Sequence, residues 1–146
     1  MSQQWIFDDP TAPPRLLKQR SGHSEPPTLI RYYGEDGKAM LTTGKDRALR
    51  YLSVVRDSRG YELSQGNIDK KASAREVRAA SLKYPVIFSL AYSTTRSRDW
   101  DDVLTASHGE RIGRTWTVQN KKIGKHVFKS DSTVTVSPPL LTGINC

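Results

Sequence analysis

The alternation of hydrophobic and polar residues changes in character near residue 28. From there, the runs TLIRYY (28–33) and AMLTT (39–43) are rich in β-branched and aromatic residues and flank the glycine-containing GEDGK, so they predict a β-hairpin. In the next run, residues 46–57, the apolar residues fall on one helical face, although YLSVV within it also suits a strand. We favour a helix there.

A second helix is expected to begin at Ser73. Ser73 and Glu76 have the spacing of a capping box, in which each side chain satisfies a free backbone amide of the first turn. Pro85 ends this helix, because proline cannot continue one. The run VIFSLAYST (86–94) then alternates as a strand does. Residues 98–109 predict a short helix, with acidic residues near its start and a glycine at its end.

Three short strand-like runs follow, with glycine or polar residues between them. They are RTWTVQ (114–119), KHVFKS (125–130) and STVTVS (132–137). No internal repeat is visible. This order of elements predicts an α+β fold, an antiparallel sheet packed with two or three helices, as a single domain over residues 28–146.

Residues 1–27 differ from the rest in composition. They contain five of the eight prolines and no persistent apolar period, which is typical of a linker. We therefore expect a flexible, disordered, proline-rich N-terminal arm ahead of the domain.

The chain of 146 residues carries a formal net charge of +8. Charges within residues 1–27 cancel, so the excess belongs to the expected domain. Such a surface favours an acidic partner, of which nucleic acid, an anionic membrane and an acidic protein are the three classes. The residues assigned to this basic surface, for lipid or nucleic acid, are Lys70, Lys71, Arg75, Arg78, Arg111, Arg114, Lys121, Lys122, Lys125 and Lys129.

The sequence has no catalytic signature. His23, His108 and His126 are far apart and at no metal-ligand spacing, and nucleotide-binding and hydrolase motifs are missing. The acids of DWDD (99–102) suit the start of a helix better than a cation site. We therefore expect no enzyme activity, no metal and no cofactor. A single cysteine, Cys146, and no apolar run of bilayer length indicate a reducing compartment, cytosol or nucleus.

The tetrapeptide Pro10-Thr11-Ala12-Pro13 lies in the expected arm. Its prolines favour a polyproline II conformation, which an aromatic-lined groove binds at little ordering cost. Together with Arg15 it also fits the P-x-x-P-x-R pattern of one class of SH3 ligand, and a stiff spacer is the simplest alternative. Its position in a charge-neutral arm before a basic domain favours a peptide ligand.

PTAP is identical to the late-domain core of retroviral Gag and of several viral matrix proteins. The run FSLAYSTTRSRDWDDVLTASH (88–108) resembles a segment of the vesiculovirus matrix core. The chain thus resembles the small matrix proteins of negative-strand RNA viruses, a rhabdovirus-like class. This resemblance implies a non-enzymatic protein that binds anionic membrane lipids, self-associates as a homo-oligomer and recruits the ubiquitin-E2-variant domain of ESCRT-I for budding. It further implies viral nucleocapsid or RNA as a partner, and a location in the cytoplasm, at the inner face of the host membrane and in the virion.

Two other functions fit the same residues. A nucleic-acid-binding viral capsid or RNA-binding accessory protein would use basic residues interleaved with Trp116 and Phe128 for phosphate contacts and base stacking. An SH3-binding adaptor would place Arg15 against acidic residues of its partner.

Overall fold

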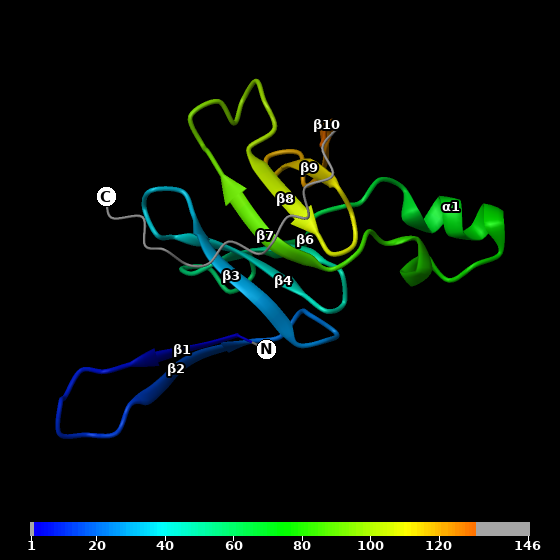
Figure 1. Cartoon of the computed structure of the whole chain (residues 1–146). Helices are drawn as coiled ribbons and strands as arrows, with labels where there is room; N and C mark the ends of the chain where they lie inside the picture. The colour runs from blue at the N-terminus through cyan, green and yellow to red at the C-terminus, as the bar shows by residue number, and fades with distance from the viewer. Residues whose placement is uncertain (1, 131–146) are drawn as a thin grey trace.

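The computed structural model describes residues 2–130, which form three antiparallel β-sheets (Figure 1). A two-stranded sheet comes first and two four-stranded sheets follow, each with its strands in sequence order. Within the described residues the chain is mostly β, with one short α-helix and one 3-10 turn. The expected α+β fold with two or three helices is therefore wrong.

Residues 1–27 were expected to form a disordered arm, and the structure shows a β-hairpin there instead. Its strands are β1 (Ser2–Ile6) and β2 (Arg15–Arg20). Arg20 donates a hydrogen bond to Asp57 at 2.6 Å, and the Lys18 ammonium lies 3.4 Å from the Val55 carbonyl oxygen. These contacts attach the hairpin to the next sheet. Division of the chain into two units near residue 27 stays a prediction.

The first four-stranded sheet is a simple meander. Its strands are β3 (Pro27–Tyr33), β4 (Ala39–Gly44), β5 (Leu49–Ser53) and β6 (Gly60–Glu62). The expected hairpin over residues 28–43 is confirmed as β3 and β4. The helix expected at 46–57 is wrong, because β5 pairs with β4 on one side and β6 on the other.

The second four-stranded sheet repeats this plan. Its strands are β7 (Ile87–Tyr92), β8 (Val103–Ser107), β9 (Ile112–Thr117) and β10 (Lys122–Lys129). The expected strands at 86–94, 114–119 and 125–130 overlap β7, β9 and β10. The helix expected at 98–109 is wrong, because β8 occupies its second half. The strand expected at 132–137 lies outside the described residues.

The hydrophobic core lies between the two four-stranded sheets. Its buried residues are Leu41, Leu49, Leu63, Ile87, Leu90, Val103, Trp116 and Val118. Burial of each large apolar side chain contributes about 1.5–3 kcal/mol. Trp116 is 1% exposed, and its indole N–H donates to the Thr105 hydroxyl at 2.7 Å, which satisfies the buried donor. Trp116 is therefore a core residue and cannot stack on a base.

Backbone and side-chain hydrogen bonds also join the two sheets. The Tyr61 hydroxyl, in β6, donates to the Val118 carbonyl at 3.2 Å. Ser64, just after β6, donates its N–H to the Lys121 carbonyl at 2.8 Å and accepts from the Ile123 N–H at 2.7 Å. The chain leaving the first sheet thus pairs with the outer strand of the second.

The α-helix α1 (Ile68–Arg75) and the 3-10 turn η1 (Ala79–Leu82) form the connection between the sheets. The helix begins after Asn67 and ends at Glu76, and both of these residues have left-handed backbone angles. Ser73 therefore lies in the last turn, and the expected capping box at the helix start is wrong. No helix of the described residues is long and apolar enough to span a membrane.

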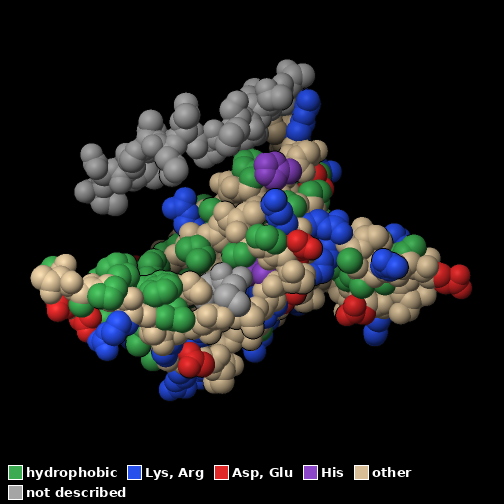
Figure 2. All heavy atoms as spheres, turned by 90° about the horizontal axis from the view of Figure 1, so that it is seen from below, with side chains coloured by type: hydrophobic (Ala, Val, Ile, Leu, Met, Phe, Trp, Pro, Cys, Tyr) green, Lys and Arg blue, Asp and Glu red, His purple; other side chains and the backbone are tan. Residues whose placement is uncertain are grey.

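Hydrophobic side chains gather on the surface of the hairpin, at the left of Figure 2. Trp5, Phe7, Leu16 and Leu17 are all exposed there, Phe7 to 79%. The two-stranded sheet therefore keeps part of its apolar surface uncovered.

Candidate ligand pocket between the two sheets

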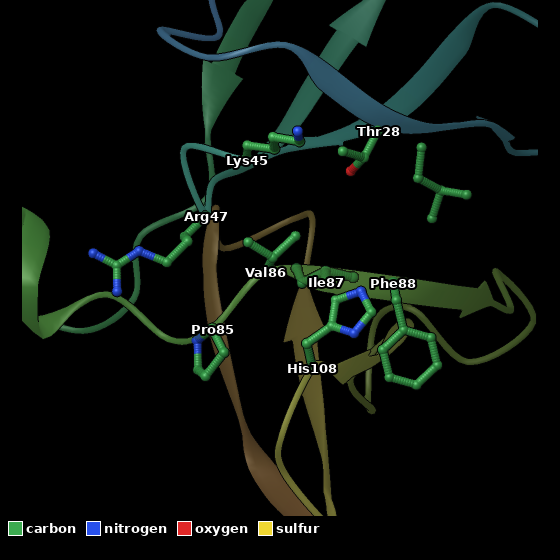
Figure 3. Close-up of a pocket in the computed structure, with 9 residues that line it drawn as sticks. Thr28, Lys45, Arg47, Pro85, Val86, Ile87, Phe88 and His108 are labelled. Carbon is green, nitrogen blue, oxygen red and sulfur yellow. The ribbon is translucent and has the colours of Figure 1, made fainter. Parts of the chain in front are cut away.

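A pocket of about 750 Å³ opens where β3 and β7 lie side by side (Figure 3). Pockets of this size hold small organic groups. It is formed by the starts of β3 and β7 and by the β4–β5 and β8–β9 turns, so each sheet supplies half. The lining residues are Thr28, Leu29, Lys45, Arg47, Pro85, Val86, Ile87, Phe88 and His108.

Most of the wall is apolar. The Phe88 ring lies 4.9 Å from the His108 imidazole, centroid to centroid, at an angle of 45°. The His108 N–H donates to the Val86 carbonyl at 2.9 Å, which fixes the β8–β9 turn against β7. The two rings together form an aromatic surface against which a flat ligand can pack.

Arg47 forms a rigid part of the wall. Its guanidinium donates to the Lys83 carbonyl at 3.2 Å and to the Ala80 carbonyl, and it turns away from Val86 in Figure 3. The Arg47 carbonyl in turn accepts from the buried Gln65 amide at 2.6 Å. Much of the donor capacity of Arg47 is thus used within the protein.

Lys45 places a cation at the mouth of the pocket. Its side chain is exposed and has no hydrogen bond or ion pair within residues 2–130. The neighbouring carboxylate of Asp46 faces His23 instead, with Nδ1 2.9 Å from the carboxylate, and also accepts the Ser24 N–H at 3.1 Å. No Asp or Glu lines the pocket in the part of the chain described here, so the Lys45 charge is not neutralised.

The chemistry of these groups suits binding. The Thr28 hydroxyl lies 3.5 Å from the Thr43 carbonyl, and the lining offers His108 no carboxylate to act as a partner in proton transfer. An apolar hollow with aromatic walls and, within the described residues, an unpaired ammonium at its mouth fits a flat ring that carries a negatively charged group.

The predicted basic surface divides into two regions. Lys70, Lys71, Arg75 and Arg78 lie on α1 and in the turn after it, whereas Arg111, Arg114, Lys121, Lys122, Lys125 and Lys129 lie on or beside β9 and β10. α1 stands away from β10 in Figure 1.

Some of these cations are already partnered. Arg114 donates to both Glu110 oxygens, which raises the pKa of Arg114, and its guanidinium lies 3.9 Å from the Tyr84 ring centroid. The Lys121 ammonium lies 4.7 Å from the Tyr61 ring centroid. The remaining members are all exposed, and their role as one binding surface stays a prediction.

The PTAP motif lies in the turn between β1 and β2, and Pro10, Thr11, Ala12 and Pro13 are all exposed. The Thr11 N–H and hydroxyl both donate to Asp9, at 2.8 and 2.7 Å, and these bonds lower the Asp9 pKa. Arg15 forms an ion pair with Asp8 across the turn. The motif is therefore an ordered hairpin turn.

The acids of DWDD act separately. Asp101 accepts hydrogen bonds from the Thr115 hydroxyl and from His126, whereas Asp102 is buried. Their expected role at a helix start is wrong. Within residues 2–130 no group of three or more His, Cys, Asp or Glu could hold a metal ion. Cys146 lies outside the described residues.

Sequence reasoning missed the pocket, and His108 was expected at a helix end. The lining residues come from four separate segments that only the strand topology brings together. The one local sequence feature that points to the pocket is the charged turn GKDR (44–47), which follows the apolar β4 and supplies Lys45 and Arg47.

Comparison with known proteins finds three similar relatives. The chain is 42% identical over 132 residues to a U3 small nucleolar RNA-associated protein 21 homolog of Schizosaccharomyces pombe, which covers 90% of this chain and 15% of that protein. It is 37% identical over 127 residues to human WD repeat-containing protein 36, covering 86% of the chain and 14% of the relative. It is 36% identical over 118 residues to U3 small nucleolar RNA-associated protein 21 of Saccharomyces cerevisiae, covering 80% and 12%. The chain thus spans about one seventh of these relatives.

These relatives correct the functional expectations. The rhabdovirus-like matrix identity is wrong, and with it membrane budding, the ESCRT-I and anionic-lipid partners and the viral nucleocapsid. The expected homo-oligomer, the viral capsid alternative and the SH3-binding adaptor are not supported either. A location in the virion or at the inner face of a host membrane is equally wrong.

The fold agrees with a family match. A β-propeller is built from blades, each a four-stranded antiparallel sheet, and this chain has two consecutive sheets of that form. The family described as the WDR36/Utp21 second beta-propeller domain matches residues 28–141, which include both four-stranded sheets except Pro27, the first residue of β3. The chain belongs to the WDR36/Utp21 second beta-propeller domain family.

Proposed function

We propose that this chain is a non-enzymatic, RNA-binding part of a β-propeller scaffold. The names of two relatives associate them with a small nucleolar RNA, and a net charge of +8 favours a polyanionic partner. The observation that carries the proposal is the position of Lys45: within residues 2–130 its ammonium has no ion-pair partner, and it lies at the mouth of an apolar, aromatic pocket that no described carboxylate lines.

An unpaired nucleotide has the complementary chemistry. Its base would pack against Phe88 and His108, and its phosphate would contact Lys45. Stacking of a base on an aromatic side chain contributes about 1–3 kcal/mol and tolerates any base. The pocket volume of about 750 Å³ is large enough for one base and its sugar.

Most of the positive charge is available to an RNA backbone. Of the 23 lysines and arginines, seven form ion pairs with Asp or Glu within the described residues. They are Arg15, Lys18, Arg20, Lys38, Arg50, Lys83 and Arg114. The others leave a positive field that attracts phosphates over a wider area than the pocket.

The test compares two charge reversals. Lys45→Glu changes the pocket mouth, and Lys38→Glu makes the same change in net charge at an exposed lysine that pairs with Asp36. We expect Lys45→Glu to weaken binding of a fluorescent single-stranded RNA, followed by anisotropy, about tenfold more than Lys38→Glu does. Equal effects of the two variants would show that only net charge matters and that the pocket is not the site.

A further inference from the structure

A second aromatic site lies at the other end of the second sheet, away from the pocket. The loop between β7 and β8 brings Trp100 against His126 of β10. The two ring centroids are 3.9 Å apart and the ring planes differ by 15°, so the rings are stacked.

A largely buried carboxylate fixes this stack. Asp101 Oδ2 lies 2.8 Å from His126 Nδ1 and accepts the backbone N–H groups of Lys125 at 3.0 Å and His126 at 3.3 Å. It also accepts the Thr115 hydroxyl at 2.5 Å. The Asp101 side chain is only 10% exposed. The imidazole is therefore held in one orientation, at the point where β10 is irregularly paired with β9.

The indole is available to a ligand. Trp100 is 46% exposed, whereas the core residue Trp116 is 1% exposed. Because the imidazole covers one face of the Trp100 indole, the exposed area lies on the other face and the edges. An indole that is stacked on an imidazole on one face and exposed on the other can stack on a further aromatic ring.

Three exposed cations lie close to Trp100 or His126 in the sequence. Arg96 and Arg98 lie on the same loop as Trp100, and Lys125 precedes His126; all three are exposed. None of them forms an ion pair with a carboxylate in the part of the chain that the structure describes. Of the acids in this loop, Asp99 is exposed, whereas Asp101 is largely buried and hydrogen-bonded and Asp102 is buried. The exposed charges of the loop and of Lys125 are therefore three positive and one negative.

We propose that Trp100 and His126 form a stacking platform for an unpaired RNA base, with Arg96, Arg98 and Lys125 contacting the flanking phosphates. This inference rests on the proposed RNA-binding function and assigns it a second contact. Stacking is tolerant of base identity, so the platform recognises single-stranded RNA of any sequence and excludes the paired bases of a duplex.

The test uses the full chain and a fluorescent oligouridine of ten nucleotides. We expect Trp100→Ala to weaken binding about tenfold and Trp100→Phe to weaken it by less than about threefold, because a phenyl ring still stacks. Trp5→Ala, which removes an exposed tryptophan from the hairpin, is the matched control and should bind as the wild type does. Duplex RNA of the same length should show no difference between Trp100→Ala and the wild type.

A second variant keeps the stack intact and removes charge. Arg96→Ala combined with Arg98→Ala should reduce the slope of log K against log salt by about 1.4, since each phosphate contact to a single strand contributes about 0.7. The thermal midpoints of all variants identify any that fail to fold.

The outcomes separate the two proposals. Oligouridine binding by the wild type with no loss in Trp100→Ala and no change of slope in the double variant would overturn the platform and leave the RNA-binding function standing. Failure of the wild type to bind any single-stranded RNA at low salt would overturn both.

Discussion

The hydroxyl of Tyr33, in the first four-stranded sheet, donates a hydrogen bond at 2.5 Å to the carboxylate of Asp102, which directly precedes β8 of the second sheet. Asp102 is 4% exposed and also accepts the Val118 N–H at 3.0 Å. A buried carboxylate is tolerated only with such partners. This bond links the two sheets, and each sheet supplies one wall of the pocket.

Removal of this hydroxyl should destabilise the protein. Tyr33→Phe leaves the buried Asp102 carboxylate short of a donor, and we expect the free energy of unfolding to fall by about 1–3 kcal/mol. Tyr32→Phe is the matched control, because Tyr32 is 62% exposed on the same strand. Urea unfolding measures both; equal stabilities would contradict a structural role for the Tyr33–Asp102 bond.

Alkaline pH should weaken the sheet–sheet contact. Burial raises the pKa of Tyr61 to about 12, and burial followed by the bond to Asp102 raises the pKa of Tyr33. Because the folded-state pKa values exceed the ordinary tyrosine value of about 10, this stability is fully present below pH 10 and is lost as the pH rises towards the folded values. Urea midpoints should fall between pH 10 and 12. Tyr61→Phe should show a shallower fall than Tyr32→Phe.

The turn that carries Lys45 depends on His23. The His23 side chain is 4% exposed and lies 2.9 Å from Asp46 through Nδ1 and 2.9 Å from the Thr42 hydroxyl through Nε2. We expect His23→Ala to cost about 2 kcal/mol, because it leaves the partly buried Asp46 without its main partner. Exposed His108→Ala should cost much less. Thermal unfolding of both variants measures the two losses of stability, and equal losses would contradict a structural role for His23.

Substitution of Gly124 should destabilise the protein, because Gly124 lies against Asp101, the carboxylate that holds His126. A Cβ at this position would lie 2.2 Å from Asp101 Oδ2 and 2.6 Å from the Thr115 hydroxyl. Gly124→Ala should therefore displace Asp101 and destabilise the protein by about 3 kcal/mol. At Gly113, in the adjacent strand, an added Cβ would lie 3.3 Å from its nearest neighbour, the terminal Cδ1 atom of the exposed Leu104 side chain. Gly113→Ala is the control, and a similar loss in both would contradict the Asp101 explanation.

The sequence predicted the strands better than the helices. The β3–β4 hairpin follows from β-branched runs on either side of a glycine-containing turn, and tertiary packing preserves that local preference. The short runs at 46–57 and 98–109 contain the strands β5 and β8, because neighbouring strands pair with them on both sides. A buried strand need not alternate, so a short apolar run within it can have helical spacing.

The sequence does not reveal that the two four-stranded sheets repeat one topology. Gly22-His23 just before β3 matches the G-H start of a WD repeat, but the first four-stranded sheet contains no W-D dipeptide, and Trp100-Asp101 lies in the loop between β7 and β8. The insertion of α1 and η1 between the sheets also lengthens the interval beyond the usual repeat of about 40–45 residues. The two sheets therefore share a topology that residue spacing alone does not reveal. The four residues of PTAP were too few to identify a viral family, and they lie in a hairpin turn.

The pocket could not be predicted for a related reason. Lys45 and His108 come from different sheets, and nothing in their local sequence marks them as neighbours. Their proximity follows from the contact between β3 and β7.

The most direct test of the RNA-binding function is a salt titration of the wild-type chain with single-stranded RNA. We expect log K to fall linearly with log salt, with a slope of about −2 or steeper, which corresponds to three or more phosphate contacts. Lys45→Glu should make the slope shallower by about 0.7. Failure to bind at low salt, or an affinity that does not change with salt, would contradict the function proposed here.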